Sequence, residues 1–167
     1  FIISTIGMIF TNIAGFVSFW ILFRNFPSIN GWSYYEMMFL YGFSLISITP
    51  VQCLFDNNWN LRMYVYSGDF IKYCFRPINL FFYYQSEIFD IKGLGQLAFG
   101  LATMVYAWTK IGLACTPLII LKTIIFLITA SLIMIAVMNA AAATCFWITN
   151  SFFVMDLALK FRDYAKY

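Results

Sequence analysis

Long apolar segments alternate with short polar ones along this chain, and this alternation predicts a helical membrane protein. The apolar segments cover residues 1–23, 35–55, 94–113 and 117–148. At about 1.5 Å per residue, each is long enough as a helix to cross a hydrocarbon core of roughly 30 Å. The fourth is longer than one perpendicular crossing needs, so we expect it to tilt or to continue past the bilayer. The pattern predicts an all-α integral membrane protein with about four transmembrane helices in one domain, residues 1–167.

The polar segment between the second and third spans covers residues 56–93, and we expect two helices in it. Pro77 divides the segment, because proline suits the first turn of a helix but not its interior. The first helix is expected at about 69–75 and the second at about 78–89. The second is amphipathic and aromatic, so we expect it to lie in the membrane interface before the chain re-enters the bilayer.

The first of these helices is the candidate functional site. Gly68 and Asp69 stand at its start, Lys72 and Arg76 mark its polar side, and Pro77 ends it. A short basic helix at the membrane edge suits the docking of a soluble partner protein. The alternative is that these are ordinary solvated charges, which satisfy the preference of basic residues for the cytoplasmic side.

The positions of lysine and arginine predict the orientation of the chain. Loops 24–34 and 110–122 carry three basic residues, whereas segment 56–93 and the C-terminal stretch carry seven. Because basic residues accumulate in cytoplasmic loops, we expect segment 56–93 and the C-terminal stretch to be cytoplasmic.

Composition supports a membrane location and argues against several functions. Hydrophobic residues make up 63% of the chain and charged residues 10%, whereas roughly a quarter of the residues in soluble domains are charged. The net charge of +3 suits lipid headgroups better than nucleic acid. The sequence has no histidine, no closely spaced cysteine pair, no phosphate-binding loop motif and no carboxylate pair inside a span. We therefore expect no metal site, no catalytic site, no cofactor of its own and no nucleic-acid partner.

Two asparagines interrupt the apolar spans, Asn12 in the first and Asn139 in the fourth. Polar side chains inside a membrane form hydrogen bonds between helices or line a substrate path. Both interpretations stay open, so Asn12 and Asn139 are possible intramembrane polar sites. In the third span, Ala98 and Ala102 are four residues apart, which predicts a face for close helix packing.

A series of short motifs extends over nearly the whole chain. In order they are Gly31-Trp32-Ser33, Leu40-Tyr41-Gly42, Gly68-Asp69, Arg76-Pro77-Ile78-Asn79, Phe89-Asp90, Gly93-Leu94-Gly95, Phe146-Trp147 and Phe161-Arg162-Asp163-Tyr164-Ala165. Their order and spacing resemble the permease subunits of ATP-binding-cassette (ABC) type-2 exporters, above all a bacterial branch of short permeases with six spans.

The resemblance implies a fold, partners and a role. Permeases of this family have a cytoplasmic N-terminus, six spans, and a coupling helix between spans two and three that sits in a cleft of a separate ATPase subunit. Here the coupling helix corresponds to Gly68 to Arg76, followed by Pro77. The family implies an ATP-driven exporter in a bacterial inner membrane, surrounded by lipid. Two permeases, identical or different, work with two ATPases that bind ATP and Mg²⁺, so this chain would not itself be an enzyme.

The chain departs from the family pattern in two ways. Asp69 stands where the family more often has glutamate. The family also continues into two further spans after the region of Tyr164-Ala165, and it has a cytoplasmic helix before the region of Phe1. We therefore expect segments to be missing at both ends, either because the sequence is incomplete or because the protein is a reduced relative.

A second function stays open. The chain has twenty phenylalanines, eleven tyrosines and no histidine. This composition also fits a non-catalytic structural subunit of a large respiratory or organellar membrane complex. Such a complex would lie in an organellar inner membrane. Such a subunit would pack through small-residue faces and bind lipid. Co-purification with nucleotide-binding subunits favours the exporter, and co-purification with a redox complex favours the structural subunit.

Overall fold

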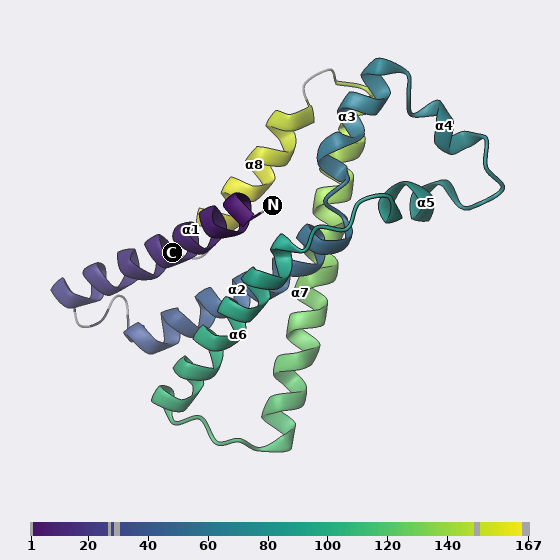
Figure 1. The fold of residues 1–167 in the computed structure, drawn as a ribbon. Coiled ribbons are helices and arrows are strands. Elements are labelled where there is room, and N and C mark those ends of the chain that lie inside the picture. Colours follow the sequence, from purple (N-terminus) through teal and green to yellow (C-terminus); the bar gives the residue numbers. More distant parts are fainter. Residues whose placement is uncertain (1, 27, 29–30, 149–150, 165–167) are drawn as a thin grey trace. The chain divides into compact units, whose positions relative to one another are not determined.

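The computed structural model describes residues 2–26, 28, 31–148 and 151–164, and every regular element among them is a helix (Figure 1). The expected all-α fold is confirmed for this part of the chain. Phe1, where the first span was expected to begin, and Ala165, where the last motif ends, lie outside it. The helices are α1 (Ile2–Asn25), α2 (Tyr34–Leu54), α3 (Asn58–Ser67), α4 (Ile71–Cys74), α5 (Leu80–Ser86), α6 (Lys92–Ile111), α7 (Pro117–Ala143), the 3-10 turn η1 (Thr144–Phe146) and α8 (Ser151–Tyr164).

Two helical runs in the described residues are long and apolar enough to cross a membrane, Tyr34–Ser67 and Pro117–Phe146. The most apolar window of the second run has none of its residues buried inside the chain. An apolar helix that finds no cover in its own chain needs lipid or another protein around it. This run therefore supports a membrane protein, while a count of four spans, with α1 and α6 among them, stays a prediction.

The contacts divide the chain into two compact units, which we describe separately. Unit 1 contains Phe1–Thr49 and Ile91–Ser131, and unit 2 contains Pro50–Asp90 and Leu132–Tyr167. Helices α2 and α7 each contribute one end to unit 1 and the other end to unit 2.

In unit 1, α1, α2 and α6 pack side by side (Figure 1). Their core is largely aromatic, with Phe19 and Phe23 of α1 packed against Tyr41 and Leu45 of α2. The Tyr41 hydroxyl donates a hydrogen bond of 3.1 Å to the backbone carbonyl of Asn12. Burial of these large side chains, together with that polar contact, holds α1 on α2.

A close backbone approach joins α2 to α6 at Gly42 and Gly100. A Cβ atom on Gly42 would lie 2.8 Å from Thr103 Oγ1 and 2.9 Å from the Gly100 carbonyl oxygen, closer than packed atoms allow. The packing face predicted at Ala98 and Ala102 is wrong for this contact, because both alanines are exposed. The buried face of α6 is instead shifted by about half a turn and includes Gly100 and Thr103.

Unit 2 is built around α3, α8, η1 and the second half of α7. Trp59 of α3 stacks on Phe152 of α8 with 6.1 Å between ring centroids, and the Arg62 guanidinium lies over the same Phe152 ring. Met138 of α7 and Met155 of α8 are fully buried in this unit. Helices α4 and α5 form a hairpin that follows α3 (Figure 1).

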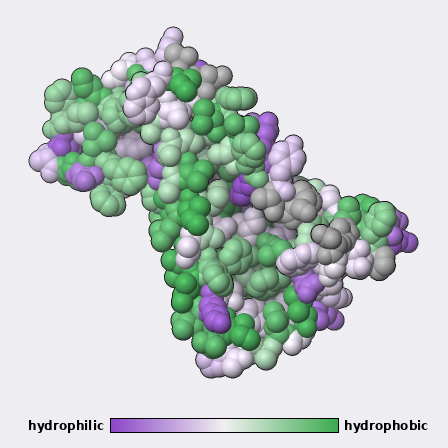
Figure 2. Space-filling view, turned by 180° about the vertical axis from the view of Figure 1, so that it is seen from behind, coloured by the Kyte–Doolittle hydropathy of each residue, from purple (hydrophilic) through white to green (hydrophobic). Residues whose placement is uncertain are grey.

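The surface is unusually apolar. Figure 2 shows hydrophobic residues over much of one face, with strongly hydrophilic residues confined to small patches. Along α7, Phe126, Ile128 and Leu132 are each more than half exposed. Because water disfavours so much exposed apolar area, this surface fits a lipid environment.

The glycine contact between α2 and α6 gives a first testable prediction. We expect Gly42→Ala to lower stability by about 1–3 kcal/mol, because the added methyl group must push the two backbones apart. Gly7→Ala is the matched control, since a Cβ at Gly7 of α1 meets no atom within 4 Å and alanine favours the helix. Thermal unfolding in detergent measures both variants, and equal melting temperatures would contradict the close contact.

Candidate functional site

The α4–α5 hairpin, residues 68–87, contains all five residues of the predicted docking site. It begins where α3 ends at Gly68, whose backbone φ of +82° lies in the left-handed region that favours glycine. The Ser67 hydroxyl donates to Asp69 Oδ2 at 2.7 Å, which holds the turn in place. Gly68 and Asp69 therefore form the corner between α3 and α4.

Helix α4 is shorter than the sequence indicates. The predicted helix from Gly68 to Arg76 is wrong in length, since the structure has a single helical turn, Ile71–Cys74, followed by a turn that contains Arg76. Pro77 explains the early end, because proline disfavours the helical conformation of the residue before it.

Helix α5 is also shorter than the predicted 78–89, and it spans Leu80–Ser86. Its start is fixed by Asn79, whose side-chain oxygen accepts hydrogen bonds from the backbone N–H groups of Phe81 and Phe82. Asparagine is among the residues most favoured at this capping position. Pro77 therefore lies in the link between the two helices rather than in the first turn of α5.

A charged pair closes the hairpin. The Lys72 ammonium of α4 lies 3.0 Å from Glu87 Oε1, just after α5, and the Tyr73 hydroxyl donates to the other carboxylate oxygen, Glu87 Oε2. The same ammonium lies over the rings of Tyr64 and Tyr73, at 4.7 Å and 4.6 Å from their centroids. Lys72 therefore contacts the body of unit 2 on one side and water on the other.

These contacts shift the pKa values of all three groups. The Tyr73 hydrogen bond, helped by Lys72, lowers the pKa of Glu87, while the bond to Glu87 raises the pKa of Lys72. Burial raises the pKa of Tyr73 to about 12. The Glu87 contribution to stability is present above the ordinary pKa of 4.5 and is lost as the pH falls through the lowered value. The Lys72 contribution is present below 10.5 and is lost as the pH rises through the raised value, so the pair is intact around neutral pH.

The outer side of the hairpin is apolar and exposed. Ile71, Phe75 and Ile78 are 60%, 79% and 56% exposed. Arg76 lies beside them, with its guanidinium 5.0 Å from the centroid of the Tyr83 ring. We call these four residues the hairpin face. Exposed apolar side chains around one arginine are typical of a protein–protein contact.

Three side-chain amides join the hairpin to the rest of unit 2. Asn139 Oδ1 of α7 accepts hydrogen bonds from Asn58 Nδ2 of α3 at 2.9 Å and from Gln85 Nε2 of α5 at 3.1 Å. Gln85 Nε2 also donates to Asn58 Oδ1 at 2.8 Å. We call Asn58, Gln85 and Asn139 the amide cluster. It connects three helices that are far apart in sequence.

A second set of bonds lies next to the amide cluster and again joins α5 to α3. Asn57 Nδ2 donates to the Tyr84 carbonyl at 2.6 Å, and the Tyr84 hydroxyl donates to the Asn57 carbonyl. The Tyr84 ring contacts those of Tyr64, Phe70 and Tyr73 edge to face. The inner side of the hairpin is therefore fixed by both polar and aromatic contacts.

The two asparagines that were predicted to lie in the membrane have different surroundings. Asn139 belongs to the amide cluster, whereas Asn12 is buried in unit 1, where its backbone carbonyl accepts the Tyr41 hydroxyl. Sequence reasoning missed Asn58, Gln85 and Glu87 as partners. A signal was present in the Asn57-Asn58 pair, which opens the polar segment 56–93 directly after an apolar run.

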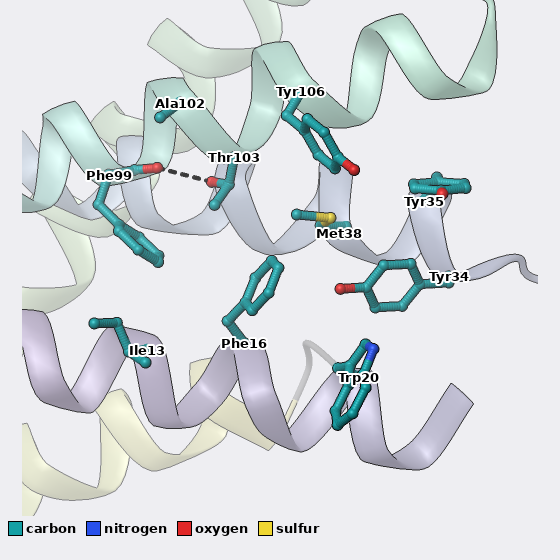
Figure 3. Close-up of a pocket in the computed structure, with 10 residues that line it drawn as sticks. All are labelled: Ile13, Phe16, Trp20, Tyr34, Tyr35, Met38, Phe99, Ala102, Thr103 and Tyr106. Carbon is teal, nitrogen blue, oxygen red and sulfur yellow. Dashed lines mark hydrogen bonds between the residues drawn. The ribbon is translucent and has the colours of Figure 1, made fainter. Parts of the chain in front are cut away.

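Unit 1 contains a cavity of about 590 Å³ (Figure 3). It opens between α1, α2 and α6, and its lining is mostly aromatic and aliphatic. The lining residues are Ile13, Phe16, Trp20, Tyr34, Tyr35, Met38, Phe99, Ala102, Thr103 and Tyr106.

Within the described residues, no group of three or more Cys, Asp or Glu side chains could hold a metal ion. The four cysteines are free, with Cys53 and Cys145 buried and Cys74 and Cys115 exposed. What the site offers is a contact surface and a set of connections.

Comparison with known proteins gives one result. A family model described as "ABC-2 family transporter protein" matches residues 9–167. No curated protein and no solved structure matches the chain significantly.

The Lys72–Glu87 pair can be tested by exchanging its charges. We expect Lys72→Glu alone and Glu87→Lys alone to speed amide hydrogen exchange in α4 and α5 by roughly two- to fivefold, the range for an exposed ion pair. The double variant should recover part of the slow exchange, because it restores an ion pair between the two positions but not the Tyr73–Glu87 hydrogen bond or the contacts of Lys72 with the tyrosine rings. Lys160→Gln, which removes an ion pair on α8, is the control and should leave the hairpin unchanged. Failure of the double variant to recover would contradict the pairing.

Proposed function

The chain belongs to the ABC-2 transporter family, and from this premise we propose that it is the membrane-spanning subunit of an ATP-driven exporter. As a family member it is an ABC transporter permease and a membrane protein. In this proposal the α4–α5 hairpin lies in the cytoplasm of a bacterial cell and contacts a separate ATPase subunit. Conformational changes of the ATPase then move the hairpin. The exposed, braced hairpin face is the observation that carries the proposal.

The hairpin face suits docking because it combines apolar area with a single arginine. Phe75 and Ile71 project into the surroundings, where they bury apolar surface once a partner covers them. Arg76 can add a charge-assisted hydrogen bond to a carboxylate of the partner. Gly68, Asp69 and Pro77 shape the turns that present this face.

Lys72 has a different part in this proposal. Its ammonium binds Glu87 and two tyrosine rings inside the chain. We assign it mainly to bracing of the hairpin, and only its exposed side is left for the partner. A braced hairpin transmits force better than a flexible loop, because a push at Phe75 then moves α5 as well.

The amide cluster extends this connection into the membrane. Gln85 lies on α5, and Asn139 lies on α7, inside the apolar run Pro117–Phe146. A displacement of the hairpin therefore acts on α7 through hydrogen bonds rather than through loosely packed side chains. In the proposed cycle, ATP binding closes the ATPase partners, the hairpin moves, and α7 changes its tilt so that the substrate path opens to the other side.

ATP and Mg²⁺ belong to the partner in this proposal, so this chain is not itself the enzyme. Two permeases, identical or different, and two ATPase subunits form the working exporter. The family match over residues 9–167 favours this function over a structural subunit of a respiratory complex.

Docking predicts a specific loss of the ATPase partner. We expect Phe75→Ser combined with Arg76→Glu to reduce co-purification of the ATPase subunit by about tenfold or more, as expected for residues at the centre of an interface. The permease should still insert into the membrane, because neither side chain belongs to the cores of the two units.

Two controls make this experiment decisive. Lys122→Glu changes a charge on the side predicted to be external, and it should not affect co-purification. The Lys72→Glu/Glu87→Lys double variant should retain the ATPase if Lys72 acts by bracing. Full retention of the ATPase by the Phe75/Arg76 variant would contradict the docking site.

Orientation can be tested with the two exposed cysteines, Cys74 of α4 and Cys115 before α7. The topology predicts that they face opposite sides of the membrane. In a Cys115→Ser variant, a membrane-impermeant maleimide should label Cys74 in inside-out vesicles and not in right-side-out vesicles. In a Cys74→Ser variant the pattern for Cys115 should reverse. Labelling of Cys74 from outside would contradict a cytoplasmic hairpin.

A further inference from the structure

The cavity of unit 1 changes in character along its length. Its volume of about 590 Å³ falls within the range of roughly 300–1,000 Å³ that is usual for small-molecule sites. Ile13, Phe99 and Ala102 line one part and carry no side-chain polar group, whereas Trp20, Tyr34 and Tyr106 gather toward the other end (Figure 3). The cavity is therefore amphipathic along its axis.

The aromatic end of the cavity coincides with the ends of three helices. Tyr34 is the first residue of α2, and its ring contacts that of Phe23 near the end of α1. Tyr35 contacts Tyr106 near the end of α6. Tryptophan and tyrosine prefer the boundary between hydrocarbon and headgroups. This end of the cavity therefore fits the level of the lipid headgroups.

Two cations stand at the same end. The Arg24 guanidinium lies 5.5 Å from the centroid of the Trp20 ring, and the Lys110 ammonium lies 5.8 Å from that of Tyr106. Both rings line the cavity, and both cations lie in the last turn of their helices. The aromatic end of the cavity therefore has two positive charges beside tyrosine and tryptophan side chains that can donate hydrogen bonds.

Glu36 is the one acidic residue in the sequence of unit 1, and it is engaged locally. Glu36 in the first turn of α2 accepts two hydrogen bonds of 2.8 Å from Ser33, one from its backbone N–H and one from its hydroxyl. This is the arrangement of a helix capping box. The two cations outnumber this carboxylate, so the net charge at this end is positive.

We propose that the cavity binds an anionic phospholipid of the surrounding bilayer. The lipid headgroup lies between Arg24 and Lys110, with Trp20 and the tyrosines as hydrogen-bond donors. One acyl chain follows the apolar part past Phe16 to Ala102. The proposal goes beyond the transport role, and it does not depend on an ATPase partner, since the cavity lies in unit 1 and the hairpin in unit 2.

The test compares two phospholipids that share the same acyl chains. The full chain, purified in a neutral detergent, is titrated with palmitoyl-oleoyl phosphatidylglycerol or with the zwitterionic phosphatidylcholine, and bound lipid is counted by native mass spectrometry. We expect the wild type to prefer phosphatidylglycerol. The Arg24→Gln/Lys110→Gln variant should lose about fivefold in affinity for each cation removed, the effect of one basic residue close to an anionic lipid surface.

Matched variants distinguish binding at this site from general electrostatic attraction between the basic residues of the protein and anionic lipid. Lys122→Gln removes a cation that lines neither this cavity nor the second one between α6 and α7, and it should keep the preference. Ala102→Phe and Ile13→Trp fill the apolar part and should reduce lipid binding, with circular dichroism showing that the helices are intact.

Three results would overturn the proposal. These are equal binding of the two phospholipids by the wild type, an equal loss of preference in Lys122→Gln, and unchanged binding in both filled variants. None of these results concerns co-purification of the ATPase. The lipid proposal can therefore fail while the proposed function holds, and the reverse is also true.

Discussion

The hydrogen bonds of the amide cluster are the constraint on which the rest of unit 2 depends. A buried polar group left without a partner destabilises a protein by about 1–3 kcal/mol, and the penalty is no smaller where water is scarce. Three side-chain hydrogen bonds join Asn58, Gln85 and Asn139 across three helices. This requirement fixes α5 against α3 and α7, and it thereby fixes where the hairpin face is presented. The apolar packing around the cluster is less directional and would tolerate a shift of α5 more easily.

Much of the fold follows from the sequence because membrane helices are specified locally. Twenty or more apolar residues predict a helix wherever they occur, and the bounds of α2 and α6 lie close to those expected. Helix α3 was not predicted, since Asp56 and the two asparagines after it are residue types typical of the start of a loop. In the structure this stretch forms one tight turn, with the Asn58 N–H bonded to the Phe55 carbonyl, and a new helix follows at once. Helix α8 was not predicted either. Its charged residues made the segment look polar, and they hid the helical spacing of the side chains on its buried side.

The candidate site was located from sequence, but its internal contacts could not be. Lys72 and Arg76 were predicted to lie at a membrane edge, and this stays a prediction. Their contacts depend on how the chain folds back on itself, which the sequence does not reveal. Glu87 follows Lys72 by 15 positions, and Asn139 follows Asn58 by 81. Pairings of this kind leave no periodic signal in a single sequence. The same holds for Gly42 and Gly100, because spacing alone favours alanines such as Ala98 and Ala102 equally well.

The chemical nature of the amide cluster has a consequence for how the cluster responds to pH. A carboxamide gains or loses no proton in the physiological range, so these three residues keep the same bonding as the pH changes, which a carboxylate–histidine pair would not. Each carboxamide is also both donor and acceptor. Among the described residues, Gln85 Oε1 is a buried acceptor with no hydrogen-bond donor. Because all three side chains are neutral, these hydrogen bonds hold α3, α5 and α7 together without placing a charge inside unit 2.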